Sequence, residues 1–189
     1  MRAPCHQGPS IMQLYACLGG YYIYLGQNTR KRVEHMVKIK PLAVSLAVSL
    51  GVGGLSALLT KDAMKQFALL DQPPLSPPGW VFPAVWTVLF ILMGVAAYQV
   101  WVENGPGRSG ALWLYGVQLV FNFLWTIIFF NTERRGFALL WLIVLWGLIL
   151  AMILRFREQS STAWKLLVPY ILWVTFAGYL NAGVWLLNR

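Results

Sequence analysis

Five long apolar stretches constrain the fold of this chain more than any other feature of its sequence. None of them contains Asp, Glu, Lys, Arg or His, and they cover residues 41–59, 81–102, 111–130, 136–154 and 166–187. A helix of about 20 apolar residues crosses the hydrocarbon core of a bilayer, where the backbone needs the internal hydrogen bonds that a helix supplies. The sequence therefore predicts an all-α integral membrane protein, a five-helix transmembrane bundle with the lipid bilayer as its partner.

The composition excludes several other classes of protein. Of the 189 residues, 58% are hydrophobic and 11% are charged, whereas soluble domains contain about 25% charged residues. The net charge of +9 does not indicate a nucleic-acid partner, because Lys and Arg lie between the apolar stretches and not along one polar face. Cys5 and Cys17 form no CxxC motif, so we expect neither a disulfide scaffold nor a metal site.

The connections between the spans predict the domain organisation. We expect residues 1–40 to be an N-terminal extension, either poorly ordered or an artefact of the start site with Met36 as the true start. Residues 41–189 then form the membrane domain. Short connections make the second to fifth spans antiparallel neighbours. Residues 60–80 contain four prolines and cannot continue a helix, which predicts a capping loop over one end of the bundle.

The basic residues predict the orientation of the bundle. The side that holds the N-terminus carries 10 Lys and Arg, and the opposite side carries 5. An excess of Lys and Arg marks the cytoplasmic side of a membrane protein, so the N-terminus is predicted to be cytoplasmic. A start at Met36 changes these counts to 6 and 5 and leaves the orientation open.

The absence of ionisable side chains from the spans limits the chemistry of the bundle. Acid–base catalysis needs a titratable group within reach of the substrate, and proton-coupled transport usually needs a carboxylate or histidine in the membrane. His6 and His35 both precede the first span, so we expect no axial haem ligation inside the bundle. We expect no required cofactor, and enzymatic activity only where the ligand itself carries the chemistry.

Two spans carry a face of polar and aromatic residues. In the third span, Gln118, Asn122 and Trp125 recur at i, i+4 and i+7 and share a face with Phe129. A carboxamide that faced lipid would lack partners, so this face is predicted to turn inward. The amides have two compatible interpretations, which are interhelical hydrogen bonding to a neighbour such as Asn181 and polar contacts to a ligand.

The fifth span repeats this pattern with Tyr170, Trp173, Ala177 and Asn181. Ala177 is small and leaves space beside the large aromatic rings. Together the two faces predict a mainly apolar cavity with a few polar groups, which suits a flat hydrophobic ligand.

Three motifs occur in order between residues 41 and 189. The first is Pro77-Pro78-Gly79-Trp80-Val81-Phe82-Pro83-Ala84-Val85-Trp86-Thr87, followed by Met93-Gly94. The second is Gln118-x3-Asn122-x2-Trp125 with Phe129-Phe130, and the third is Pro169-Tyr170-x2-Trp173-x2-Phe176-Ala177-x2-Leu180-Asn181-x3-Trp185. On five spans, this set resembles the tryptophan-rich sensory protein and translocator protein family.

The resemblance implies a five-helix membrane protein, often dimeric, that binds porphyrins such as protoporphyrin IX. In animal members it also implies binding of cholesterol and synthetic drugs. Trp86 and Trp173 match two pocket tryptophans implicated in light-dependent porphyrin breakdown, and the pocket opens beneath the first loop. With the residues of the two polar faces, the candidate ligand-binding set is Trp86, Phe90, Gln118, Asn122, Trp125, Phe129, Tyr170, Trp173, Ala177 and Leu180.

The sequence also departs from the family pattern. Leu75 stands where the family commonly has Trp or Phe in the loop, which changes the capping contacts. The animal sterol motif is absent, because Ala182 and Leu186 occupy its Tyr and Arg positions, so we do not expect physiological cholesterol binding. The small-residue pairs at 147/151 and 178/182 permit a homodimer without requiring one.

Three functions agree with these residues. A receptor or carrier with a regulatory or transport role would bind a tetrapyrrole by stacking it on Trp86, Trp125 and Trp173. A light- and oxygen-dependent porphyrin degrader would use Trp86 and Trp173 as catalytic residues while the porphyrin absorbs light. A transporter of tetrapyrroles, sterols or other small hydrophobic molecules is the third, although no inverted repeat indicates an alternating-access mechanism. We favour the receptor or carrier.

Overall fold

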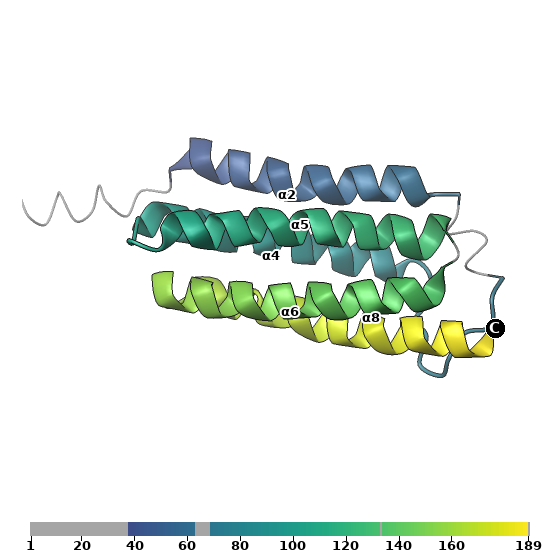
Figure 1. Cartoon of the computed structure of the whole chain (residues 1–189). Helices are drawn as coiled ribbons and strands as arrows, with labels where there is room; N and C mark the ends of the chain where they lie inside the picture. Colours follow the sequence, from purple (N-terminus) through teal and green to yellow (C-terminus); the bar gives the residue numbers. More distant parts are fainter. Residues whose placement is uncertain (1–37, 63–68, 133, 189) are drawn as a thin grey trace, which may run out of the picture. The chain divides into compact units, whose positions relative to one another are not determined.

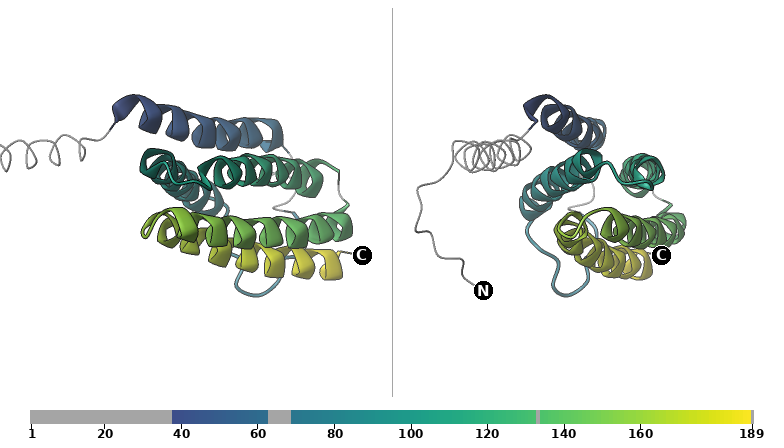
Figure 2. Two further views of the ribbon diagram at one scale, coloured as in Figure 1. Left: turned by 60° about the vertical axis from the view of Figure 1, so that its left-hand side comes forward. Right: turned by 90° about the vertical axis from the view of Figure 1, so that its left-hand side faces the viewer.

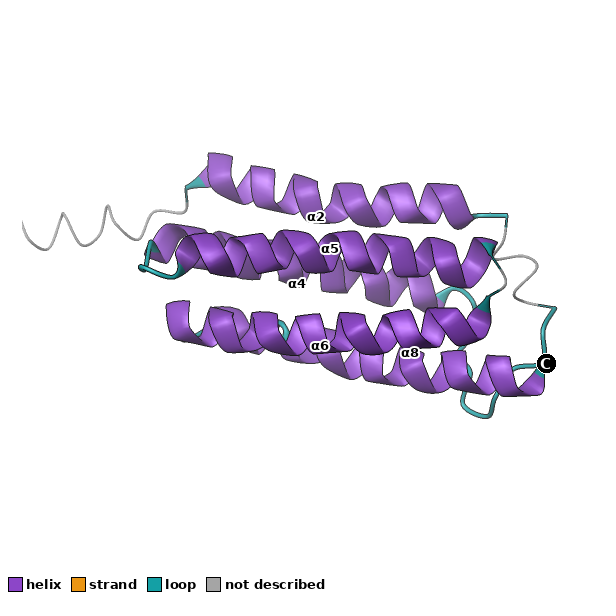
Figure 3. Ribbon diagram, in the orientation of Figure 1, coloured by secondary structure: helices purple, strands orange, loops and turns teal. Residues whose placement is uncertain are grey.

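The computed structural model describes residues 38–62, 69–132 and 134–188. Every regular element in these residues is a helix (Figures 1 and 3), which confirms the predicted all-α class. The chain divides into the units Met1–Lys38 and Ile39–Arg189, and the architecture below is that of the second unit. The predicted extension at residues 1–40 lies almost wholly outside the described residues.

Five helical segments are long and apolar enough to cross a membrane, as predicted. The first four are α2 (Ile39–Thr60), α4 (Val81–Glu103), α5 (Arg108–Asn131) and α6 (Arg135–Gln159). The fifth consists of the short helix α7 (Ala163–Leu166) and α8 (Val168–Leu187). α6 continues beyond the predicted end of its span through Arg155 and Arg157, because long arginine side chains can reach the polar interface from a helix that is still continuing.

Local sequence explains where two of the helices end and begin. α4 is followed by Asn104 in the left-handed conformation, with φ of 52°, which asparagine tolerates better than most residues. Pro106 follows and disfavours continuation of the helix. Pro169 lies in the first turn of α8, where its missing N–H would have had no helical partner in any case.

α2 packs on α4 and α5 through small and hydroxyl side chains. The Ser45 hydroxyl donates to the carbonyl oxygen of Gly94, and the Ser49 hydroxyl shares a hydrogen bond with the Tyr115 hydroxyl. A Cβ atom at Gly94 would lie 3.2 Å from the Cα atom of Leu46. Glycine at this position therefore permits the close approach of α2 and α4, as small residues do in membrane helix pairs.

The remaining helices pack beneath α4 and α5, with α6 against α5 and α8, and α7 against α4 (Figures 1 and 2). The Trp141 indole ties α6 to α5, because its Nε1 donates to the carbonyl oxygen of Phe121 at 2.9 Å. The rings of Trp141 and Phe121 also stack, with their centroids 4.7 Å apart. α6 is thus fixed to the bundle through its contacts with both α5 and α8.

The described part of the proline-rich loop, residues 69–80, is attached to α8 and its C-terminal end. Asn188 Nδ2 donates to the Asp71 carbonyl oxygen at 2.8 Å, and the Asp71 N–H donates to Asn188 Oδ1 at 3.1 Å. The Tyr179 hydroxyl donates to the Pro74 carbonyl oxygen at 2.8 Å. Leu75, at the position that departs from the family pattern, has φ of 69° and is 81% exposed.

Candidate ligand-binding pocket

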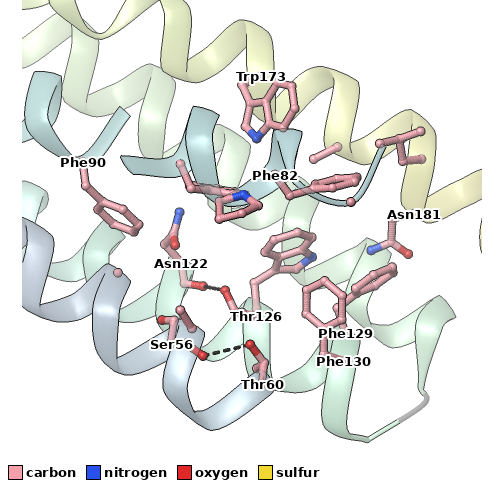
Figure 4. Close-up of a pocket in the computed structure, with 18 residues that line it drawn as sticks. Ser56, Thr60, Phe82, Phe90, Asn122, Thr126, Phe129, Phe130, Trp173 and Asn181 are labelled. Carbon is pink, nitrogen blue, oxygen red and sulfur yellow. Dashed lines mark hydrogen bonds between the residues drawn. The ribbon is translucent and has the colours of Figure 1, made fainter. Parts of the chain in front are cut away.

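A pocket of about 290 Å³ lies between α2, α4, α5 and α8 (Figure 4). Its walls come from the second half of α2, the first half of α4, the second half of α5 and the middle and second half of α8. None of the residues that line it carries a charge. The pocket is therefore an apolar site within the membrane-spanning bundle, as the two inward faces predict.

Most of the predicted ligand-binding residues lie together in this pocket. Eight of the ten line it, namely Trp86, Phe90, Asn122, Trp125, Phe129, Trp173, Ala177 and Leu180. Gln118 and Tyr170 do not line it, and both side chains are fully buried beside it. That the eight lining residues contact a ligand stays a prediction.

Trp86, Trp125 and Phe129 form an aromatic wall of the pocket, because their rings contact one another in turn. The rings of Trp86 and Trp125 have centroids 6.2 Å apart, and Trp125 stacks on Phe129 at 5.6 Å with an interplanar angle of 19°. Phe82 meets Trp173 edge to face at 6.0 Å. These separations are typical of favourable aromatic pairs, and together the rings offer a surface on which a flat molecule can stack.

A buried hydrogen-bond network lies next to the pocket and joins α5 to α8. The Tyr170 hydroxyl donates to Gln118 Oε1 at 2.9 Å and accepts a hydrogen bond from Asn122 Nδ2 at 2.8 Å. The predicted interhelical bonding of these amides is thus present, with Tyr170 as the partner in place of Asn181. Asn181 cannot take this role because it lies about 16 Å further along α8 than Tyr170, at a rise of about 1.5 Å per residue.

Three side chains that line the pocket have buried polar atoms with no hydrogen-bond partner within residues 38–62, 69–132 and 134–188. These atoms are the indole Nε1 of Trp125, the indole Nε1 of Trp173, and both Nδ2 and Oδ1 of Asn181. Asn181 has no exposed surface. A buried polar group left unpaired costs about 1–3 kcal/mol, so a ligand that bonds to these groups would recover that energy.

α2 contributes a wall that the sequence analysis missed. Gly53, Ser56, Ala57 and Thr60 line the pocket, and the two hydroxyls are already satisfied by carbonyl oxygens one turn earlier, each at 2.9 Å. The signal that could have identified this wall is the recurrence of small and hydroxyl residues on one helical face. The other lining residues outside the predicted set are Gly79, Phe82, Pro83, Thr126, Phe130 and Asn181.

The chain is similar to a family of known proteins over most of its length. The TspO/MBR family matches residues 43–186, which is most of the chain. The chain belongs to the TspO/MBR family. The match confirms the family resemblance drawn from the three motifs, and with the five apolar helices it establishes a multi-pass integral membrane protein.

Individual members of the family are similar over most of their length. The tryptophan-rich protein TspO of Chlorobaculum tepidum is 36% identical over 151 residues, which is 78% of this chain and 94% of that protein. The tryptophan-rich sensory protein of Cereibacter sphaeroides is 41% identical over 132 residues, 70% of this chain and 81% of its own. The translocator protein of Bos taurus is 35% identical over 155 residues, 80% and 91% of the two chains.

Proposed function

We propose that this protein is a membrane receptor or carrier that binds a tetrapyrrole, such as protoporphyrin IX, in the pocket between α2, α4, α5 and α8. Membership of a family whose proteins are named translocator and sensory proteins supports a receptor or transport role. The observation that carries the ligand class is the aromatic wall beside polar atoms of Trp125, Trp173 and Asn181 that have no partner among the described residues. A flat aromatic ligand with polar atoms at its edge matches both features.

The charge of the lining residues limits how a porphyrin would bind. An ionised carboxylate is costly to bury without a partner, and no lining residue carries a positive charge. We therefore expect the macrocycle to lie in the pocket and its carboxylates to stay at the membrane surface. The volume of about 290 Å³ is at the lower limit of about 300 to 1,000 Å³ for small-molecule sites, so a macrocycle has to widen the pocket.

A titration of protoporphyrin IX in the dark tests this proposal. Detergent-purified protein should show saturable quenching of tryptophan fluorescence. Trp125→Leu should raise the dissociation constant about tenfold, because it removes a stacking ring. Trp113→Leu is the matched control, since Trp113 is 71% exposed and does not line the pocket. Absence of saturable quenching in the wild type, or equal effects of the two variants, would overturn the proposal.

Light- and oxygen-dependent degradation of the bound porphyrin is the second candidate function. The observation in its favour is that Trp86 and Trp173 line the same pocket from α4 and α8. The porphyrin would absorb light and activate dioxygen, dioxygen would oxidise the macrocycle, and the two indoles would be the redox-active side chains positioned beside it. In Trp86→Phe/Trp173→Phe, dark binding should survive while light-dependent loss of porphyrin absorbance disappears. Equal bleaching with and without protein would exclude this activity.

Transport of sterols or other small hydrophobic molecules stays the third alternative. It predicts faster exchange of the ligand between vesicles in the presence of the protein. Unchanged exchange alongside saturable binding of protoporphyrin IX would favour a receptor.

We also propose that the N-terminus is cytoplasmic, as the basic residues predict. Cys5 and Cys17 are the two cysteines of the chain and both precede the first span. A membrane-impermeant maleimide should therefore label the full chain only after the cells are opened. Labelling of intact cells would reverse the orientation.

Of the small-residue pairs at 147/151 and 178/182, only the first is available on the surface of the protein for contact with a second copy. Gly178 faces Leu142 of α6, because a Cβ atom at this position would lie 3.7 Å from that side chain. At Gly147, by contrast, a Cβ atom would meet none of the described atoms within 4 Å. We propose the outer face of α6 at Gly147 as the contact between two copies, which crosslinking in membranes would test.

A further inference from the structure

A second cavity lies on the outside of the bundle, between α4 and α8. It is a shallow groove of apolar side chains that includes Ala84 and Val88 from α4, and Leu172 and Phe176 from α8. α4 packs mainly on α2 and α7, and α8 mainly on α6, so α4 and α8 meet each other only loosely along this groove. Because all of these residues lie within membrane-spanning segments, the groove opens toward the hydrocarbon of the bilayer.

Trp173 separates this groove from the pocket. It lines both cavities, and its side chain is partly exposed. Aromatic contacts position its ring, with Phe82 at 6.0 Å and Phe176 at 5.6 Å. Its Nε1 has no partner in the part of the chain that the structure describes, so rotation of the ring breaks no hydrogen bond of the indole. Figure 4 shows Trp173 at the edge of the pocket, beside Phe82.

The other route by which a ligand could reach the pocket, past the proline-rich loop, is more restricted than the groove. The described part of the loop is tied to α8 by the paired hydrogen bonds of Asp71 and Asn188 and by the bond from Tyr179 to Pro74. A hydrophobic ligand also dissolves in the bilayer and not in water, so passage through the loop would expose its apolar surface to water. The lateral groove avoids both obstacles.

We propose that the hydrophobic ligand enters and leaves the pocket laterally from the bilayer, through the groove between α4 and α8, with Trp173 as the side chain that opens and closes the passage. This inference rests on the proposed function, since it needs a flat ligand that binds in the pocket. A flat molecule can pass edge-on between two helices that pack loosely, and displacement of one ring joins the groove to the site.

The access route can be tested by adding bulk to the groove without touching the pocket. Val88 lines the groove but not the pocket and is 54% exposed. Val120 on α5 is 56% exposed and lines neither cavity. Val88→Phe and Val120→Phe are therefore the same substitution at equally exposed positions, and only the first narrows the groove.

Stopped-flow quenching by protoporphyrin IX in the dark measures both rate constants. Val88→Phe should slow association and dissociation by the same factor, about tenfold for a passage with added steric hindrance, and leave the dissociation constant unchanged. Val120→Phe should match the wild type, and Val88→Ala should be as fast or faster.

Three outcomes separate the route from the binding site. If Val88→Phe has the same rates as Val120→Phe while the wild type binds saturably, the lateral route is overturned and the proposed function stands. A higher dissociation constant with an unchanged association rate would also overturn the lateral route, because the groove would then be part of the binding site. If the wild type shows no saturable quenching, the proposed function fails and the access route fails with it.

Discussion

Two sets of buried polar groups lie on the same helices, and they differ in whether their hydrogen bonds are made. In the first set, the Tyr170 hydroxyl joins the amides of Gln118 and Asn122 across α5 and α8. In the second, further along α8, both amide atoms of Asn181 are buried with no partner among the described residues. The first set is a structural link between two helices, and the second is available to a ligand.

The comparison predicts opposite responses to mutation. Removal of a member from the first set leaves its buried partners unpaired, which lowers the free energy of unfolding. Removal of an unpaired group from the second set eliminates a cost of folding but also eliminates a contact to the ligand. Stability and affinity should therefore respond separately in the two places.

The largest effect is expected for Tyr170→Phe. The variant keeps the ring but removes the hydroxyl that bonds to two amides, so the free energy of unfolding should fall by about 2 kcal/mol. Denaturation in detergent micelles, followed by circular dichroism, measures this change. Tyr179→Phe is the matched control, because it removes an exposed hydroxyl that bonds only to the Pro74 carbonyl oxygen. A similar loss in both variants would remove the distinction between the two sets.

Asn181→Leu should change stability in the opposite direction. Leucine has a similar shape and no polar atoms to leave unpaired, so the free energy of unfolding should rise by about 1 kcal/mol. The dissociation constant for protoporphyrin IX should rise about tenfold, since a polar contact to the ligand is lost. Asn122→Leu provides the comparison, because it deprives Tyr170 of a donor and should destabilise the fold. Destabilisation by Asn181→Leu as well would show that its amide is already satisfied.

Gly53→Ala sharpens the comparison at the wall of the pocket. A Cβ atom at Gly53 would lie 2.5 Å from two atoms of the Phe90 ring, so the ring has to shift, and porphyrin affinity should weaken about fivefold. Gly51→Ala on the same helix meets no described atom within 4 Å and brings the same gain in helix propensity. Equilibrium quenching of the two variants tests this difference. Equal affinities would mean that the Phe90 side of the pocket does not contact the ligand.

The smallest effect is expected for Asn188→Ala. It removes the two bonds to the Asp71 backbone, which are exposed to solvent, so stability should change by only about 0.5 kcal/mol. Hydrogen exchange of the Asp71 amide should nevertheless become faster, while exchange in α6 stays the same. Unchanged exchange at Asp71 would show that the loop is held in place by other contacts.

The fold could be predicted from the sequence because its main signal is local. Each span is a long apolar run, and hydrogen-bonding requirements in lipid leave little choice besides a helix. The end of α6 could not be predicted from hydropathy, because Arg155 and Arg157 are compatible both with a helix end and with a continuing helix.

The site could be predicted only in part, because its residues are marked in the sequence but the way in which the helices bring them together is not. The inward faces of α5 and α8 are marked by amides and aromatic rings, but the partner of Asn122 depends on how far one helix is displaced along the other. That displacement places Tyr170, and not Asn181, beside the amides. The wall from α2 consists of small residues such as Gly53 and Ala57, which are common in any membrane helix and do not by themselves mark a site.

α6 packs along α5 and α8 but contributes none of the residues that line the pocket. Substitutions on the faces of α6 that pack on α5 and α8 can therefore affect the ligand only indirectly, through the packing and stability of the bundle. We expect natural or engineered variants on these inward faces to alter how much folded protein a cell accumulates, while the protein that does fold keeps its choice of ligand.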